Sequence, residues 1–305
     1  MNLFKRSRTF VTLFITTGMI GIKAVLPLSH FERLDLDGVL FWSEKRYGKR
    51  QYDILLMGNS RLYMGVSPMV LMEHVPNASV YNFGFSGGII NRQLLEEAKK
   101  RIRKDGKRIL VFCCTPECLR AIKNKHFFSI KKANVALSLF PSFIVYSKNR
   151  TQMAVASTCA CGYIGECVKE DRDAMWLTYG VYSKLFHTRP FLPSDFEHFV
   201  QNLKWCKRNN IKVVAYRMVS CHEMDELEDK LSGVDWNKIK QAVLDEGFVW
   251  LERPPSPLLE QIEEHCYDAS HLNAEGAELF SNWLGQELAK LDWFKENQQT
   301  SEIKE

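Results

Sequence analysis

From residue 52 onward, short apolar runs alternate with amphipathic stretches. Uninterrupted apolar runs are typical of strands that are buried on both faces of a parallel sheet, and apolar residues at helical spacing indicate helices. The expected strands are 53–57, 79–83, 108–114, 211–216 and 248–251. The expected helices are 90–105, Ser194 to about Arg208, 235–246 and 273–291. This order predicts a three-layer α/β/α domain around a mostly parallel five-stranded sheet.

Two regions break the alternation and suggest the limits of this domain. Residues 120–190 lack a regular pattern and carry aromatic residues, so we expect an inserted cap within a domain spanning 51–294. Residues 295–305 are polar and are expected to form a disordered tail. Residues 29–50 would be a linker.

The N-terminus has the pattern of a signal anchor. Residues 1–8 carry three positive charges, and Thr9–Leu28 is a 20-residue stretch with Lys23 as its one charge. About 20 apolar residues cross a bilayer, and flanking positive charges favour the cytoplasmic side. We therefore expect a transmembrane helix at 9–28, a cytoplasmic stub at 1–8, and a domain exported to the periplasmic side of the inner membrane. A cleaved signal peptide and a helix packed on a soluble protein are the alternatives.

Composition and charge limit the possible classes of protein. Of the 305 residues, 46% are apolar and 25% are charged, as in an ordinary globular protein. Residues 1–8 and 99–108 together hold a net charge of +9, so the rest of the chain sums to −4. A body of that charge is a poor duplex-DNA binder, and no nucleic-acid partner is expected. The run at 99–108 is read as a solvated face, with a lipid headgroup or acidic glycan contact as the alternative.

The nine cysteines do not decide the compartment. Six are scattered through expected strands and helices, where a thiol is commonly a small buried apolar group. Cys159, Cys161 and Cys167 form a cluster that lacks a fourth spaced ligand, so we expect no metal, although an oxidising compartment would favour a disulfide there.

Three segments that carry candidate chemistry follow strands or precede the last helix. Gly58-Asn59-Ser60-Arg61 comes directly after the first strand, where a tight turn can expose a serine hydroxyl. The glycine-rich turn N-F-G-F-S-G-G at 82–88 follows the second strand and could present backbone N–H groups to an oxyanion. Each segment alone is equally well explained as a helix cap or a flexible turn.

The third segment is D-A-S-H-L-N-A-E-G at 268–276. An aspartate three residues before a histidine can accept the imidazole Nδ1–H, which leaves Nε2 free as a base. A serine needs such a base to attack a carbonyl at neutral pH. Capping of turns by Asp268 and Asn273 is the simpler alternative for this segment.

In combination, the three segments resemble the SGNH (GDSL-like) hydrolase superfamily over about residues 50–290. The closest likeness is to membrane-anchored acyltransferases and esterases of envelope polysaccharides, in which G-N-S-R and D-x-x-H-L-N-x-x-G recur. The resemblance implies a flavodoxin-like α/β fold, with Ser60 as nucleophile, His271 as general base and Asp268 as its orienting partner. It also implies an oxyanion hole formed by the backbone N–H groups of Ser60 and Gly84, and no cofactor.

The sequence departs from the family pattern in two places. Asn59 stands where the family has Asp, and residues 113–117 lack the Asn that donates to the oxyanion. Thr115, Asn82 or Arg61 could replace that donor. We therefore expect Asn59, Arg61, Asn82 and Thr115 to contact substrate.

The function implied by the resemblance is cleavage or transfer of acyl esters, most plausibly acetyl esters, of a cell-surface polysaccharide through an acyl-serine intermediate. Partners would be the membrane, the acylated glycan and other proteins of envelope polysaccharide biosynthesis. Two alternatives remain: a catalytically inactive glycan-binding or assembly factor, and a soluble intracellular esterase.

Overall fold

The computed structural model describes residues 44–121 and 172–295, and its described part contains a five-stranded parallel sheet. The strand order is β2-β1-β3-β4-β5, and every pairing is parallel. The expected α/β class and the five-stranded parallel sheet are thus confirmed. The strands are β1 (Ile54–Met57), β2 (Val80–Asn82), β3 (Ile109–Cys114), β4 (Lys212–Arg217) and β5 (Val249–Leu251).

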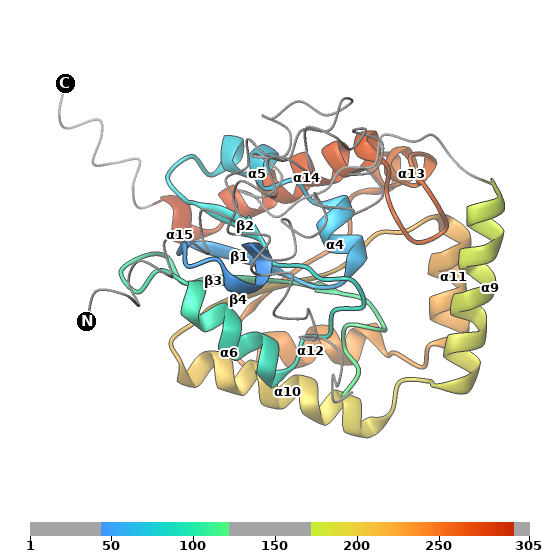
Figure 1. Ribbon diagram of the computed structural model, residues 1–305, viewed down its shortest axis with the longest axis horizontal. Helices are drawn as coiled ribbons and strands as arrows, with labels where there is room; N and C mark the ends of the chain where they lie inside the picture. Colours follow the sequence, from blue (N-terminus) through green and yellow to red (C-terminus); the bar gives the residue numbers. More distant parts are fainter. Residues whose placement is uncertain (1–43, 122–171, 296–305) are drawn as a thin grey trace, which may run out of the picture. The chain divides into compact units, whose positions relative to one another are not determined.

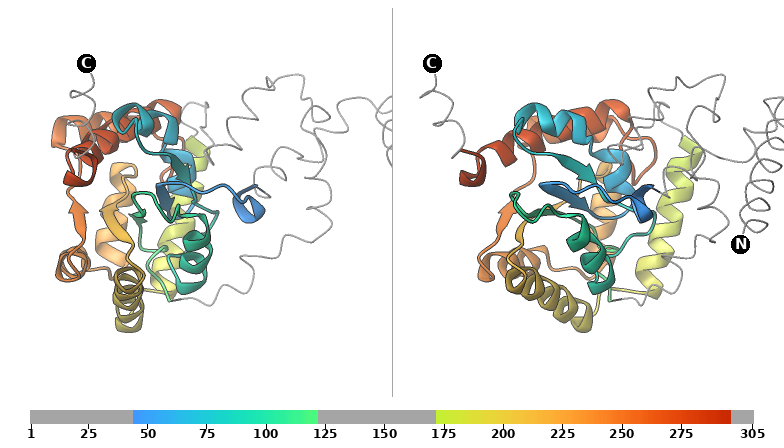
Figure 2. Two further views of the ribbon diagram at one scale, coloured as in Figure 1. Left: turned by 90° about the vertical axis from the view of Figure 1, so that its left-hand side faces the viewer. Right: turned by 60° about the vertical axis from the view of Figure 1, so that its left-hand side comes forward.

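Helices cover both faces of the sheet (Figures 1 and 2). One face carries α4 (Ser60–Gly65), α5 (Pro68–His74), α13 (Ser256–Glu264) and α14 (Ala274–Ala289). The other face carries α6 (Arg92–Arg101), α10 (Pro193–Arg208) and α12 (Trp236–Asp245). Two more helices, α9 (Arg172–Thr188) and α11 (His222–Leu231), lie side by side, and the short α15 (Asp292–Lys295) follows α14.

The strands form because their apolar residues can be buried on both faces. All residues of β1, β2 and β3 are buried, which matches the uninterrupted apolar runs in the sequence. Leu56 pairs in register with Val111, and Val111 pairs with Val214. These residues belong to one core cluster with Phe280 of α14. Burial of this cluster anchors α14, and therefore the loop that precedes it.

The order of the strands predicts where a ligand would bind. The chain runs from β1 to β2 on one side and then returns to place β3 on the other side of β1. Open α/β sheets bind ligands beyond the carboxyl ends of the strands at such a reversal point. The segments that follow β1 and β3 meet there, and they begin at Gly58 and Thr115.

Several elements differ from the sequence-based expectation or lie outside it. The region expected to be an insertion ends in α9, a regular helix of 17 residues. Helices α5, α11 and α13 were not predicted. The expected signal anchor, most of the linker, residues 122–171 of the insertion and residues 296–305 of the tail lie outside the described residues. Within the described part of the chain, no helix combines the length and apolar character needed to span a membrane.

Candidate active site

The turn between β1 and α4 places Ser60 at the first position of a helix. Asn59 caps this helix, and its side-chain oxygen accepts the Arg61 N–H at 3.1 Å. A Cβ at Gly58 would lie 2.9 Å from the Cβ of Cys113, so glycine allows β1 and β3 to approach closely at this point. The first N–H groups of a helix, which include that of Ser60, have no partner within the helix and can donate to a group outside it.

The segment before α14 is held by its own polar groups. Asn273 is the N-cap of α14 and accepts the Gly276 N–H at 3.0 Å. Leu272 is 1% exposed and pairs with Cys266 across a backbone bridge. A Cβ at Gly276 would lie 2.5 Å from the His265 carbonyl oxygen. These contacts hold the loop before α14, which contains the D-x-x-H-L-N-x-x-G pattern, in one conformation, and this loop carries His271.

The structure brings Ser60, His271 and Asp268 together, although they are far apart in the sequence. Ser60 Oγ lies 2.8 Å from His271 Nε2. His271 Nδ1 lies 2.9 Å from each carboxylate oxygen of Asp268. With its proton on Nδ1, the imidazole donates to Asp268 and accepts the Ser60 hydroxyl proton at Nε2. A serine, a base and an orienting carboxylate at these distances can carry out nucleophilic acyl chemistry.

The surroundings of Asp268 keep its carboxyl group ionised beside His271. Burial alone would raise the pKa of this carboxyl group. The hydrogen bond and charge of His271, together with the Ser270 and His271 backbone N–H groups, outweigh burial, so the pKa lies below its ordinary value. Those two N–H groups are 2.7 and 2.8 Å from Asp268 Oδ1. The carboxylate is thus ionised and fixed in orientation.

The expected second oxyanion donor has another partner in the structure. The Gly84 N–H donates to Asn82 Oδ1 at 3.0 Å, while Asn82 Nδ2 donates to the carbonyls of Leu62 and Val66 at 2.9 Å. Asn82 is fully buried. This side chain holds the turn after β2 against α4, and it offers no free polar group to a substrate.

The other residues expected to contact substrate are also internal. Asn59 Nδ2 donates to Thr115 Oγ1 at 3.0 Å, and both side chains are buried. Thr115 Oγ1 also accepts the Cys118 N–H. Arg61 is 0% exposed and bonds to protein groups behind the site. In this structure the side chains of Asn59, Arg61, Asn82 and Thr115 are thus buried and bonded to protein groups, and they support the loops that carry Ser60 and His271.

Sequence reasoning missed the residues that partner Arg61. Its Nε donates to Ser270 Oγ at 2.9 Å, and its Nη2 lies 2.6 Å from Glu228 Oε1. A signal for Glu228 did exist, because it shares one face of α11 with the buried residues Met224 and Leu227. A carboxylate at a position of apolar periodicity indicates a buried charge with a partner.

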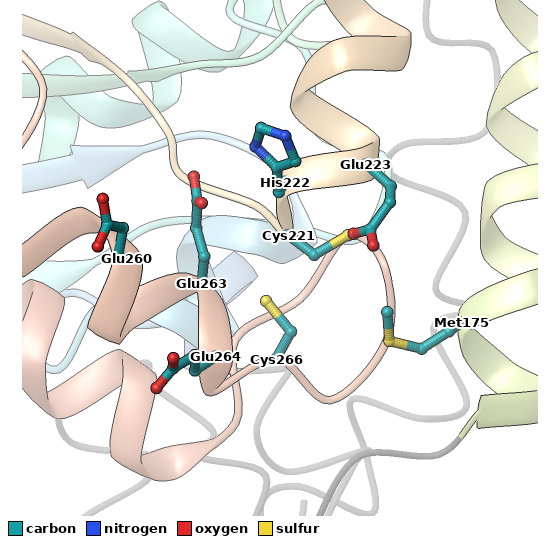
Figure 3. A pocket seen from close by; sticks show the side chains of 8 residues that line it. All are labelled: Met175, Cys221, His222, Glu223, Glu260, Glu263, Glu264 and Cys266. Atoms are coloured by element: carbon teal, nitrogen blue, oxygen red, sulfur yellow. The ribbon is translucent and has the colours of Figure 1, made fainter. Parts of the chain in front are cut away.

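Two cavities adjoin the loop that carries Asp268 and His271. The first, of about 490 Å³, is lined mainly by acidic and sulfur-containing side chains (Figure 3). The second, of about 480 Å³, reaches Ala269 and the aromatic residues Trp176 and Tyr179 of α9. Ser60 and His271 are not among the lining residues of either cavity.

No cluster of candidate metal ligands occurs in the described ranges 44–121 and 172–295. The six cysteines in these ranges are free and buried, as the sequence predicted for them. Cys159, Cys161 and Cys167 lie outside them.

No protein-family model matches this chain, and no curated protein matches it. A solved structure described as a platelet activating factor from Streptococcus pneumonia aligns with 87% of this chain and 98% of its own, at 11% identity and a TM-score of 0.40.

Two further solved structures are similar. One is described as an acylhydrolase from Bacteroides fragilis, with 12% identity, 80% and 88% coverage of the two chains and a TM-score of 0.35. The other is a GDSL-like lipase from Bacteroides thetaiotaomicron, with 10% identity, 87% and 99% coverage and a TM-score of 0.37. At this level of similarity none of the three bears on the chemistry of the site, which follows from the side chains of this chain.

Proposed function

We propose that the chain is an SGNH-like serine hydrolase or acyltransferase that acts on acyl esters. The observation that carries this proposal is the continuous chain of contacts from Ser60 Oγ through His271 to Asp268, at 2.8 and 2.9 Å. Its position beyond the carboxyl ends of the strands, at the reversal of the strand order, supports the proposal further.

The proposed reaction has two halves. Ser60 Oγ attacks the ester carbonyl carbon while its proton passes to His271 Nε2, and Asp268 stabilises the imidazolium that forms. The bond from the carbonyl carbon to the alkoxy oxygen then breaks, and that oxygen leaves with the proton from Nε2. Water or an acceptor hydroxyl attacks the acyl-Ser60 and gives its proton to His271, which returns a proton to Ser60 Oγ.

For the substrate, we propose an O-acylated, specifically O-acetylated, polysaccharide at the cell surface. The cavity beside Ala269 supports a sugar ligand, because Trp176 and Tyr179 offer aromatic surface and Glu223 and Glu226 offer hydrogen-bond acceptors.

For location, we propose a membrane anchor at 9–28 and export of the domain. The proposed partners are the membrane and other envelope polysaccharide biosynthesis proteins.

A fluorophosphonate probe, which reacts with activated serines, tests the catalytic proposal. Wild type is expected to be labelled covalently, and Ser60→Ala and His271→Ala are expected to lose labelling because each removes one half of the proton transfer. Ser86→Ala is the matched control, since Ser86 is an exposed serine of the neighbouring glycine-rich turn. Absence of labelling in a folded wild-type protein would rule out an activated Ser60.

A second candidate function is a catalytically inactive glycan-binding or assembly factor. Two features favour it: the Gly84 N–H is bonded to Asn82, and residues 115–117 directly after β3 include no Asn. Loss of one oxyanion donor typically lowers kcat by about 10²–10³-fold. Folded wild-type protein that binds an acetylated glycan but neither releases acetate nor reacts with the probe would support this second function.

A further inference from the structure

A cluster of buried charges lies directly behind the candidate active site. Arg61 follows Ser60 in the sequence, and both Arg61 and Glu228 are almost fully buried. Glu228 Oε2 lies 3.6 Å from Arg217 Nη2, which is also 3.7 Å from Asp225 Oδ1. Removing such charges from water is costly, and well-packed apolar residues often stabilise a fold equally well. Stability alone therefore does not account for a buried arginine beside Ser60.

Arg61 connects the two segments that carry the candidate catalytic residues. Its backbone belongs to α4, whose first residue is Ser60. Its Nε donates to Ser270 Oγ at 2.9 Å, and the Ser270 N–H donates to Asp268 Oδ1 at 2.7 Å. The guanidinium group thus bonds directly to Ser270, the residue whose backbone N–H holds the Asp268 carboxylate.

The Arg61 guanidinium group is held in place from two further sides. Glu228 of α11 lies 2.6 Å from Nη2, and the Tyr182 ring of α9 lies with its centroid 5.3 Å from Cζ. The Tyr182 hydroxyl is also 3.2 Å from Ser270 Oγ. Arginine suits this position because its donors form a rigid planar fork that can contact two partners in a fixed geometry.

We propose that Arg61 is a positioning residue, which sets the distance between Ser60 and His271 by tying the start of α4 to Ser270. Glu228 fixes the guanidinium group, and Ser270 passes this constraint to Asp268 and His271. The inference rests on the proposed serine chemistry and goes beyond it, since Arg61 touches neither the substrate nor the reacting atoms. A misplacement of about 1 Å between reacting groups can lower the rate by about 100-fold.

Two substitutions separate geometry from charge. Arg61→Lys keeps a positive charge beside Glu228. It loses the planar guanidinium group, whose separate nitrogen atoms contact Glu228 and Ser270 at the same time. Ser270→Ala removes the acceptor of the Arg61 Nε–H and leaves the ion pair with Glu228 in place. For both variants we expect the rate of fluorophosphonate labelling and kcat for a small soluble ester to fall by about 10- to 100-fold. KM is expected to stay within about twofold, because no substrate contact changes.

Arg217→Lys is the matched control. Arg217 contacts the same Glu228 and lies in the same buried cluster, but its guanidinium group contacts side chains of α11 and α12. We expect this variant to lower the melting temperature and to keep the wild-type labelling rate per folded molecule. A purely structural role for the cluster predicts instead that Arg61→Lys and Arg217→Lys change stability and rate in parallel.

The outcomes distinguish this inference from the proposed function. If wild type is not labelled, the proposed function fails. If wild type is labelled and folded Ser270→Ala reacts at the wild-type rate, the positioning role of Arg61 is overturned, whether or not Arg61→Lys folds. Equal rate losses in Arg61→Lys and Arg217→Lys would overturn it as well.

Discussion

At the residue scale, Asp268 shows how hydrogen bonds stabilise a carboxylate that is largely buried. Its Oδ1 atom accepts hydrogen bonds from the Ser270 and His271 backbone N–H groups, and the imidazole lies against both oxygens. These contacts form only in the folded chain. They lower the pKa of Asp268 in the folded state, so they also link its ionisation to the stability of the fold.

Asp268→Asn should remove a pH-dependent part of the stability. Since the folded pKa is depressed, the carboxylate contributes stability above its unfolded pKa of about 3.9, and this contribution is lost as pH falls through the lower folded value. Urea unfolding from pH 2 to pH 6 measures the effect. We expect the stability of wild type to fall more steeply below about pH 4 than that of Asp268→Asn.

The neutral variant separates stability from activity at the same residue. At pH 7 we expect Asp268→Asn to react with the fluorophosphonate probe about 10²–10⁴-fold more slowly, because an amide cannot fix the same imidazole tautomer. Parallel stability curves for the two proteins across the acid range would contradict the contribution assigned to Asp268.

Individual residues also show which parts of the candidate site local sequence could predict and which it could not. Ser60, Asp268 and His271 were predicted as a group because each stands in a recognisable short pattern. Arg61 was predicted to contact substrate, because it could replace the oxyanion donor that residues 113–117 lack. Its burial depends on Glu228 and Ser270, which are distant in the sequence, and no local pattern indicates that these partners converge on it.

At the element scale, the strands were predictable and several helices were not. An apolar run such as 109–114 has few alternatives to a buried strand. Helix α11 is rich in acidic residues, and its buried face includes Asp225 and Glu228, so its apolar periodicity is interrupted. Helix α5 has seven residues, too few to establish a clear period. These helices form because tertiary contacts compensate for weak local signals.

Gly276 of α14 offers a test of how tightly this element fixes the active-site loop. A Cβ at this position would lie 2.5 Å from the His265 carbonyl oxygen, so Gly276→Ala must displace the loop or the helix. We expect a loss of about 1–3 kcal/mol in the free energy of unfolding, measured in urea. The labelling rate should fall as well, since the same loop carries His271.

Gly180→Ala in α9 is the matched control for this substitution. Nothing lies within 4 Å of a Cβ built at Gly180, and the residue is exposed within a helix. This variant should gain about 0.5–1 kcal/mol, because alanine favours the helix more than glycine does. A Gly276→Ala protein as stable as wild type would show that the entry to α14 is less constrained than its contacts indicate.

At the scale of the whole molecule, the described cysteines bear on the compartment. Burial raises the pKa of Cys118 and Cys206 to about 12, and Cys113 and Cys114 are fully buried and shifted in the same direction. A thiol reacts through its thiolate, so these groups resist oxidation. Free cysteines in this domain are therefore compatible with an oxidising compartment, and they do not oppose the proposed export.

Membrane anchoring can be decided by comparing the full chain with a chain that starts at residue 29. If residues 9–28 span the bilayer, the full chain should stay in the membrane fraction after a carbonate wash, because its apolar segment has no favourable place in water. The shortened chain should be released as a folded protein with the wild-type labelling rate, since Ser60 and its partners lie within the described domain. Release of an intact full chain by carbonate would rule out a spanning segment. A shorter soluble product whose N-terminus lies near residue 29 would instead identify a cleaved signal peptide.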